Sequence, residues 1–158
     1  MACFTAPQEL HDLAFRYGHA VDTRDAEELG SLFTADGRIG SYPDGIVRYC
    51  GAAGWAQMIA EVAASFGETM HNVFNQTFEQ DAHGTVRGLT TGIASHLVGE
   101  EESDLAVLDF AMRYHNRYAM EQGLWKFAER RLEVVWVERR PVRRFSPAML
   151  GRELAGFR

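Results

Sequence analysis

Hydrophobic and polar positions divide the chain into a helical first part and a strand-rich second part. Residues 7–21 place apolar side chains on one helical face, and residues 55–66 do so more regularly. Between these segments, Thr23 or Asp25 is a candidate N-cap for a second, short helix. Segments 34–37 and 42–45 have turn sequences, which predict a small hairpin between Arg38 and Cys50.

Beyond Gly67 the hydrophobic period changes to that of strands. Long strands are expected at 70–80, 86–98, 105–120 and 124–137. The short connections between them favour an antiparallel meander over a parallel sheet. Helices first and strands afterwards predict an α+β architecture, in which a curved antiparallel sheet folds around three N-terminal helices.

Alternation assigns the strand side chains to two faces of the sheet. On the first long strand, His71 and Asn75 are expected to share a face. On the last strand, Arg130 is expected on one face and a group of apolar residues on the other. That group comprises Trp125, Phe127 and Val135. Because monomers rarely leave a large apolar patch open, this second face predicts a homo-oligomer.

Length and composition narrow the class of protein. The 158 residues fit one domain, and 46% hydrophobic with 24% charged residues is ordinary for a soluble globular protein. No apolar run reaches the roughly 18 residues of a membrane span, and the N-terminus lacks the features of a signal peptide. We therefore expect a cytoplasmic protein with no membrane partner.

Charge is distributed unevenly along the chain. The net charge is −6, yet the last 20 residues contain six arginines and one glutamate. The rest of the chain is therefore strongly acidic, which argues against nucleic acid as a partner. The segment 139–158 is expected to form a basic arm with a short helix that begins near Ser146 and Pro147.

No local motif indicates a metal or another cofactor. Cys3 and Cys50 lie outside any CxxC pattern, and the six histidines include no HExxH or HxH pair. The candidate chemistry instead rests on Asp22, at the end of the first helical segment, and His71, at the start of the first long strand. A carboxylate that orients an imidazole is suited to general-base catalysis, and spacing alone does not say whether the two meet.

Four short motifs carry a resemblance to a known family. They are Arg16-Tyr17 with Asp22, the segment LFTADG at 32–37, TMHN at 69–72 and LWKF at 124–127. The chain resembles the SnoaL-like (nuclear-transport-factor-2-like) superfamily, within it the group of scytalone dehydratase, the bile-acid dehydratases and hexachlorocyclohexane dehydrochlorinase. The resemblance implies a cone-shaped α+β barrel over residues 1–138 and an assembly of three subunits, or alternatively two.

The resemblance also implies an activity and a set of residues. His71 would remove a carbon-bound proton, Asp22 would pair with His71, and Tyr17, helped by Arg130, would contact the substrate. The implied enzyme is a cofactor-independent lyase of the dehydratase type that acts on a small hydrophobic cyclic molecule. An isomerase, a polyketide cyclase or a non-catalytic binding or assembly module are the alternatives. Residues expected to line the substrate pocket are Phe33, Tyr42, Tyr49, Trp55, Met58, Asn75 and His96.

Structural roles compete with these functional ones. Asp22 would also serve as a helix-end residue, and Tyr17 lies on the apolar stripe of its helix. Arg130 lies between Glu129 and Glu133 and would equally form a salt bridge there.

Overall fold

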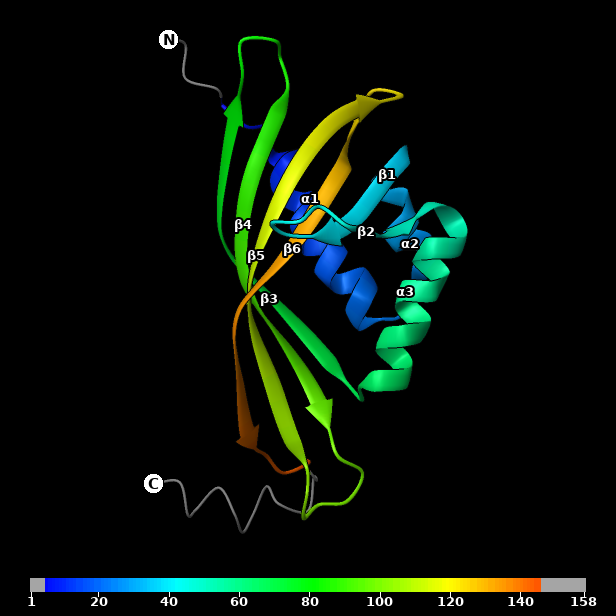
Figure 1. The fold of residues 1–158 in the computed structure, drawn as a ribbon, viewed down its shortest axis with the longest axis vertical. Coiled ribbons are helices and arrows are strands. Elements are labelled where there is room, and N and C mark those ends of the chain that lie inside the picture. Colours follow the sequence, from blue (N-terminus) through cyan, green and yellow to red (C-terminus); the bar gives the residue numbers. More distant parts are fainter. Residues whose placement is uncertain (1–4, 146–158) are drawn as a thin grey trace.

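The computed structural model describes residues 5–145, which form three helices and six strands (Figure 1). The helices are α1 (Gln8–Asp22), α2 (Ala26–Ser31) and α3 (Gly51–Ser65). The strands are β1 (Phe33–Ser41), β2 (Val47–Cys50), β3 (Thr69–Gln80), β4 (Val86–Val98), β5 (Ala106–Glu121) and β6 (Leu124–Pro141). The elements follow the order that the hydrophobic pattern predicts, and β1 with β2 is the expected hairpin.

All six strands belong to one sheet, in the order β2-β1-β6-β5-β4-β3. From β3 to β6 it is the predicted antiparallel meander. The expectation of a wholly antiparallel sheet is wrong, because β1 pairs with β6 in parallel. β2 and β3 form the two edges, so within residues 5–145 the sheet is an open mixed sheet and not a closed barrel. The segment between β1 and β6 contains β2, α3 and the strands β3 to β5, and a connection of this length makes the parallel pairing possible.

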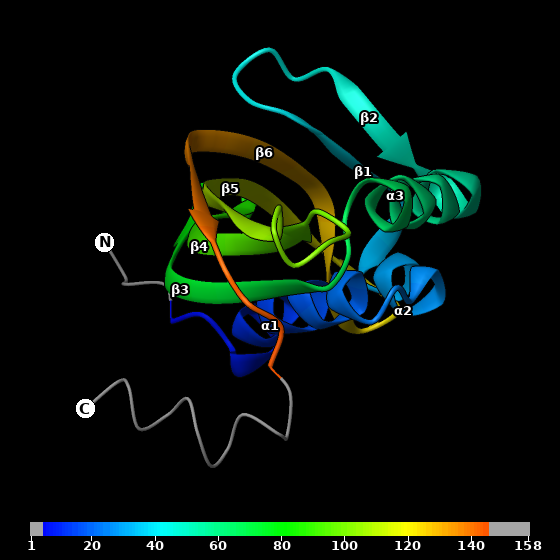
Figure 2. The ribbon, with the colours of Figure 1, turned by 90° about the horizontal axis from the view of Figure 1, so that it is seen from below.

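The helices lie on one side of the curved sheet, and α1 packs against β3 (Figures 1 and 2). The apolar stripe of α1 explains this packing, since Leu10, Leu13 and Val21 are almost fully buried. The short α2 begins where the side chain of Asp25 accepts a hydrogen bond from the Glu28 N–H at 2.8 Å. This cap confirms one of the two predicted N-cap candidates.

Irregular positions in the strands change several predicted faces. A register shift between Arg117 and Tyr118 inserts an extra residue into β6, so alternation restarts there. Phe127 is consequently 0% exposed and lies in the core with Arg130, against the prediction that it faces outward. The segment 34–37, predicted as a turn, lies inside β1 beside another register shift.

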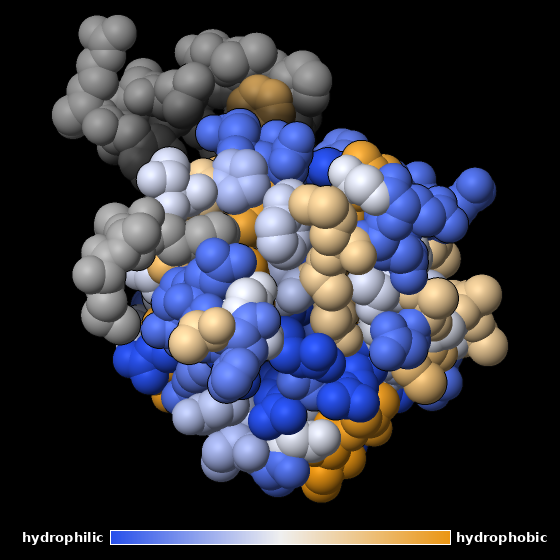
Figure 3. Space-filling view, turned by 90° about the horizontal axis from the view of Figure 1, so that it is seen from above, coloured by the Kyte–Doolittle hydropathy of each residue, from blue (hydrophilic) through white to orange (hydrophobic). Residues whose placement is uncertain are grey.

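The outward apolar surface is therefore composed differently from the prediction. Val135 is 37% exposed, whereas Trp125 packs partly buried against the core. The most exposed aromatic residue of β6 is Trp136, at 61%, in a run of apolar residues towards the end of that strand. Seen from above, by contrast, hydrophilic side chains cover most of the molecule (Figure 3).

The last strand continues beyond residue 138. Residues 139–141 pair with β5, so the first residues of the expected arm belong to the sheet. Arg140 forms an ion pair with Asp109 at 2.7 Å, and Arg144 forms one with Glu68 at 3.1 Å. The short helix predicted from Ser146 lies outside the described residues. No helix within the described part of the chain is long and apolar enough to cross a membrane.

Candidate active site

Asp22 and His71 meet where the end of α1 lies against the start of β3. The Oδ1 atom of Asp22 lies 2.7 Å from Nδ1 of His71, and its Oδ2 atom accepts the His71 backbone N–H at 2.9 Å. The side chains are only 10% and 23% exposed, His71 being the more buried. The two residues are thus joined at both the ring and the backbone.

The electrostatics favour an ionised carboxylate in this pair. Burial alone would raise the pKa of Asp22, but the hydrogen bonds from His71 and Thr69 outweigh it and hold that pKa below its usual value. An ionised carboxylate accepts a hydrogen bond from Nδ1–H and so fixes the tautomer of the ring. Nε2 of His71 makes no hydrogen bond to any described residue. Its lone pair is therefore the one available to take a proton.

Thr69 and Arg24 hold the carboxylate and the start of β3 together. The Thr69 hydroxyl donates to Oδ1 of Asp22 at 2.9 Å and accepts a bond from the Arg24 guanidinium at 2.8 Å. Arg24 also donates to the carbonyl oxygens of Val21 and Gly67. Its backbone adopts φ 61°, the left-handed conformation that lets the chain leave α1 sharply. Sequence reasoning did not single out either residue, although Thr69 lies in the TMHN motif.

A glycine in α1 leaves the space that His71 occupies. A Cβ atom at Gly18 would lie 3.0 Å from the Cβ atom of His71, tighter than nearly all real contacts of this kind. Gly18 is buried and helical, where glycine costs about 1 kcal/mol relative to alanine. The close approach of α1 and β3 leaves no room for a larger side chain at this position, which explains why glycine is present despite this cost.

Beyond the ring of His71 lies an apolar surface that contains a second imidazole. The rings of His71 and His96 are 5.6 Å apart, and His96 packs between Phe66 and Phe110. Burial, followed by the charge of His71, lowers the pKa of His96. Its Nδ1 atom lies 3.1 Å from the carbonyl oxygen of Ala94, which identifies Nδ1 as the protonated nitrogen of a neutral ring. His96, one of the predicted pocket residues, thus lies next to His71.

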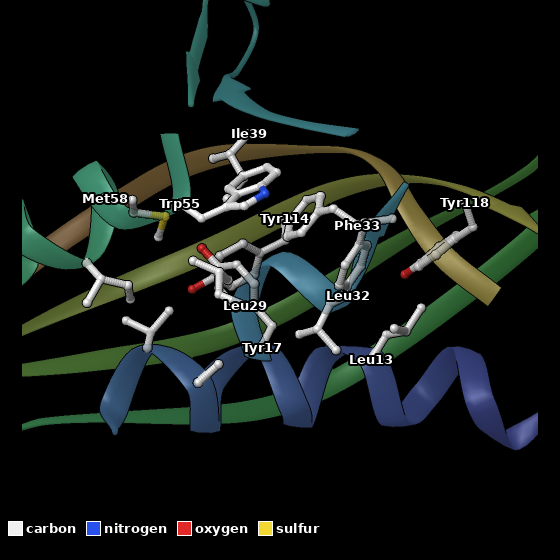
Figure 4. Close-up of a cluster of buried hydrophobic side chains, with 14 of the residues drawn as sticks. Leu13, Tyr17, Leu29, Leu32, Phe33, Ile39, Trp55, Met58, Tyr114 and Tyr118 are labelled. Carbon is white, nitrogen blue, oxygen red and sulfur yellow. The ribbon is translucent and has the colours of Figure 1, made fainter. Parts of the chain in front are cut away.

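Two tyrosine rings and one arginine form the interior next to the pair. Tyr17 on α1 and Tyr114 on β5 lie 6.1 Å apart between ring centres, with their hydroxyl oxygens close together (Figure 4). The Arg130 guanidinium lies over both rings, 4.2 Å from the centre of Tyr17 and 3.9 Å from that of Tyr114. Burial raises the pKa of both tyrosines, so each keeps a proton to donate. The Asp22 charge also raises the pKa of Tyr114.

Arg130 is a completely buried cation with no carboxylate partner among residues 5–145. Its side chain is 0% exposed, and one terminal nitrogen donates to Oδ1 of Asn116 at 2.9 Å. Asn116 in turn donates to Thr90 at 3.1 Å. Within the described part of the chain, the Nε and second terminal nitrogen of Arg130 have no acceptor. The salt bridge expected as an alternative does not form, because Glu129 bonds Arg38 and Arg131 on the opposite face.

Arg130 is held by the aromatic rings and by one neutral amide. Taking a charge out of water without a partner is expensive, so a developing negative charge nearby would relieve this site. The cation–π contacts offset part of that cost.

Three other predicted pocket residues are core residues around this site. Phe33, Trp55 and Met58 are at most 7% exposed, and the first two stack at 4.5 Å (Figure 4). Tyr49 is partly buried, but its hydroxyl bonds to Glu61 of α3, which raises the pKa of that tyrosine to about 12. Its hydroxyl is therefore already occupied.

Tyr42 and Asn75 do not reach the pair of Asp22 and His71. Tyr42 lies on the loop between β1 and β2, 41% exposed, and stacks on His115 at 3.8 Å on the outer face of the sheet. Asn75 is exposed because a bulge between Val73 and Gln76 reverses the alternation after His71. Assigning both residues to the pocket was wrong.

The sequence reading missed the residues that hold Arg130. Tyr114, Asn116 and Thr90 lie on the inner face of β4 and β5. Polar side chains in otherwise apolar strand positions were the available signal. Within residues 5–145, no cluster of three histidine, cysteine or acidic side chains is arranged to hold a metal ion.

The chain belongs to the SnoaL-like domain family, whose model matches residues 4–131. No curated protein matches it in sequence. Among solved structures it resembles a hexachlorocyclohexane dehydrochlorinase (LinA type 2) at 21% identity and TM-score 0.73, covering 89% of this chain and 92% of that one.

Two further structures from named organisms show the same fold. A scytalone dehydratase-like protein from Novosphingobium aromaticivorans has 21% identity and TM-score 0.69, with 92% and 93% of the chains covered. The LinA type 3 dehydrochlorinase from Novosphingobium barchaimii has 20% identity and TM-score 0.71, with 89% and 93% covered. At such identities the comparison establishes the fold, and the reaction has to be argued from the site.

Proposed function

We propose that the protein is a cofactor-independent lyase that removes a proton from carbon and expels a hydroxyl or halide from a small hydrophobic cyclic molecule. The observation that carries this proposal is the 2.7 Å contact between Asp22 and Nδ1 of His71, next to a buried arginine with unused donors. The likeness to dehydrochlorinase and dehydratase-like folds supports it.

The first step assigned to the pair is proton transfer. Nε2 of His71 accepts the proton from a carbon next to the bond that breaks, and the electron pair of the C–H bond forms the new double bond. Asp22 stabilises the imidazolium that results, as its depressed pKa favours. Well-placed general-base catalysis contributes about 10²–10⁴-fold.

The departing group leaves towards Tyr17 and Arg130. A tyrosine hydroxyl that keeps its proton donates to the leaving oxygen or halide, and the guanidinium stabilises its charge. Electrostatic stabilisation by one such donor is worth about 10²–10³-fold. The interaction of the Arg130 charge with the departing group is strong because its buried site excludes water, which would otherwise screen it.

An isomerase or a polyketide cyclase is the second candidate. Either reaction begins with the same proton abstraction, and the Tyr17 and Arg130 donors would then stabilise an enolate oxygen. The absence of a leaving group from the products would distinguish these reactions from elimination.

We also propose a homo-oligomer, with a trimer ahead of a dimer. The support is the exposed apolar run Val134, Val135, Trp136 and Val137 on β6. Sedimentation of the full chain tests this proposal, and a monomer at micromolar concentration would contradict it.

The decisive experiment for the reaction is proton exchange at carbon. The protein is incubated in D₂O with a panel of cyclic β-hydroxy ketones, β-halo compounds and enolisable ketones, and NMR and mass spectrometry report deuterium uptake, water loss or halide loss. His71→Gln should abolish every enzyme-dependent signal, whereas His83→Gln, on the exposed β3–β4 connection, should not. A His71→Gln variant that retains activity within tenfold would falsify the assignment of the base.

A further inference from the structure

The outer face of the sheet contains a hollow, on the opposite side from His71. It has a volume of about 490 Å³, within the range of small-molecule sites. Its floor is built from the strands β3 to β6, and its wall is Tyr42 of the β1–β2 loop. Asn116, which bonds Arg130, borders this hollow, but the charged residues of its floor take no part in the mechanism above.

A row of charged residues crosses this floor. Cross-strand pairing places Glu79, Arg87, Arg117 and Glu129 side by side on successive strands. Arg87 and Arg117 are direct partners, an arrangement of like charges that destabilises an antiparallel pair. Neither arginine forms an ion pair with a residue of the described part of the chain, not even with the neighbouring glutamates.

A third arginine lies in the adjacent row. Arg131 donates one bond to Glu129 at 3.1 Å, while its buried Nε atom has no acceptor. Glu129 also accepts from Arg38 at 2.9 Å, and these two arginines lower its pKa against the effect of burial. Glu129 is thus already paired with two arginines, and the hollow is lined by three arginines against two glutamates, in a chain whose net charge is −6.

The wall of the hollow is a rigid aromatic pair. The rings of Tyr42 and His115 are parallel within 7° at 3.8 Å. Nε2 of His115 lies 2.8 Å from a carboxylate oxygen of Glu133, which orients the imidazole. The Tyr42 backbone N–H donates to the Leu132 carbonyl oxygen at 3.0 Å and anchors the loop. With Tyr42 41% exposed, part of its ring is available to a ligand.

We propose that this outer hollow binds a small organic anion, a carboxylate or phosphate attached to a flat ring. One oxyanion between Arg87 and Arg117 would remove their mutual repulsion, because guanidinium groups bind such anions through paired hydrogen bonds. The ring of the ligand would lie against Tyr42. This site is separate from the proposed catalytic one and does not depend on its chemistry.

Phenyl phosphate is a suitable probe, followed by calorimetry and by ¹H–¹⁵N spectra of the labelled full chain. Arg117→Gln and Arg87→Gln should each weaken binding roughly tenfold or more, as expected for a lost charge-assisted hydrogen bond. Arg48→Gln, the same charge change at an exposed position outside the hollow, should leave it unchanged. Tyr42→Ala should weaken binding of phenyl phosphate but not of inorganic phosphate, and added salt should weaken both.

Four outcomes would overturn the proposal. If wild-type protein shows no saturable binding, the site does not exist. If Arg48→Gln weakens binding as much as Arg117→Gln does, the probe is held only by general charge attraction. Loss of binding in His71→Gln would show that the ligand binds on the other face of the sheet. If Arg117→Gln instead changes the sedimentation of the protein and no probe binds, the hollow is a contact between subunits.

Discussion

Replacing Asp22 by asparagine tests the central contact without any knowledge of the substrate. The carboxylate accepts three hydrogen bonds, from the ring and backbone of His71 and from Thr69. Asparagine keeps the size of the side chain but carries no charge, and its Nδ2 group is a donor. We therefore expect His71 to change tautomer, because Nδ1 must then accept a hydrogen bond and Nε2 must take the proton.

The size of the effect follows from the same contacts. Asp22 is only 23% exposed, so solvent screens these bonds weakly. Losing the charge from a hydrogen-bonded pair costs about 1.5–3 kcal/mol, and the free energy of unfolding at pH 7 should fall by about that amount. Because the folded pKa of Asp22 is depressed, its contribution is present above the ordinary value of 3.8 and is lost as the pH falls through the folded pKa. The asparagine variant should lack that acid dependence, and its turnover should fall by about 10²–10⁴-fold.

Long-range ¹H–¹⁵N spectra of the histidine rings measure the tautomer, and urea unfolding measures the stability. His96, whose Nδ1 atom faces a carbonyl oxygen, is an internal reference that should not change. An Asp22→Asn protein whose His71 keeps its proton on Nδ1, with unchanged stability, would refute the claim that this carboxylate sets the state of the ring.

Three further predictions address the surroundings of the pair. Tyr17→Phe keeps the ring beneath Arg130, so the variant should fold normally while turnover falls roughly 10- to 1000-fold; unaltered kinetics would return Tyr17 to a packing role. Gly18→Ala should gain helix propensity but displace His71, whose Cβ atom lies 3.0 Å away, so activity should drop with little loss in melting temperature; full activity would show that the strand yields. His96 has a depressed folded pKa, so the unfolded chain binds more protons and stability should decline as the pH falls below 6.5. Urea unfolding at pH 5 and 7.5 should show that acidification lowers the stability of His96→Gln less than that of wild type, whereas His83→Gln should behave as wild type does. An equal loss of stability in all three proteins would contradict the prediction.

The strand faces show where reading alternation along the chain failed. His71 and Asn75 were predicted to share a face, but they do not, because a bulge lies between them. Phe127 was placed outside for the same reason. A bulge depends on how two strands pair, and a single strand carries no periodic trace of it.

Tyr42 and Arg130 show the same limit for polar and aromatic side chains. Tyr42 has the aromatic side chain expected of a pocket residue. Its loop, however, folds onto the outer face, where its ring stacks on His115. Arg130 has two acidic residues near it in sequence, but Glu129 bonds Arg38 and Glu133 bonds His115 instead. Which partner such a side chain meets depends on strands that are distant in sequence.

The order of helices and strands, the hairpin and the candidate pair were therefore available from the sequence, because hydrophobic period and turn chemistry are local and the family motifs are short. Only the tertiary structure decided that β1 runs parallel to β6, that Arg130 is buried without a carboxylate, and that Asp22 bonds a residue 49 positions away. The physical reason is that these features arise from packing between segments. The energy of a buried charge or an oriented imidazole depends on every group around it, and here those groups come from α1 and from the strands β3, β4, β5 and β6.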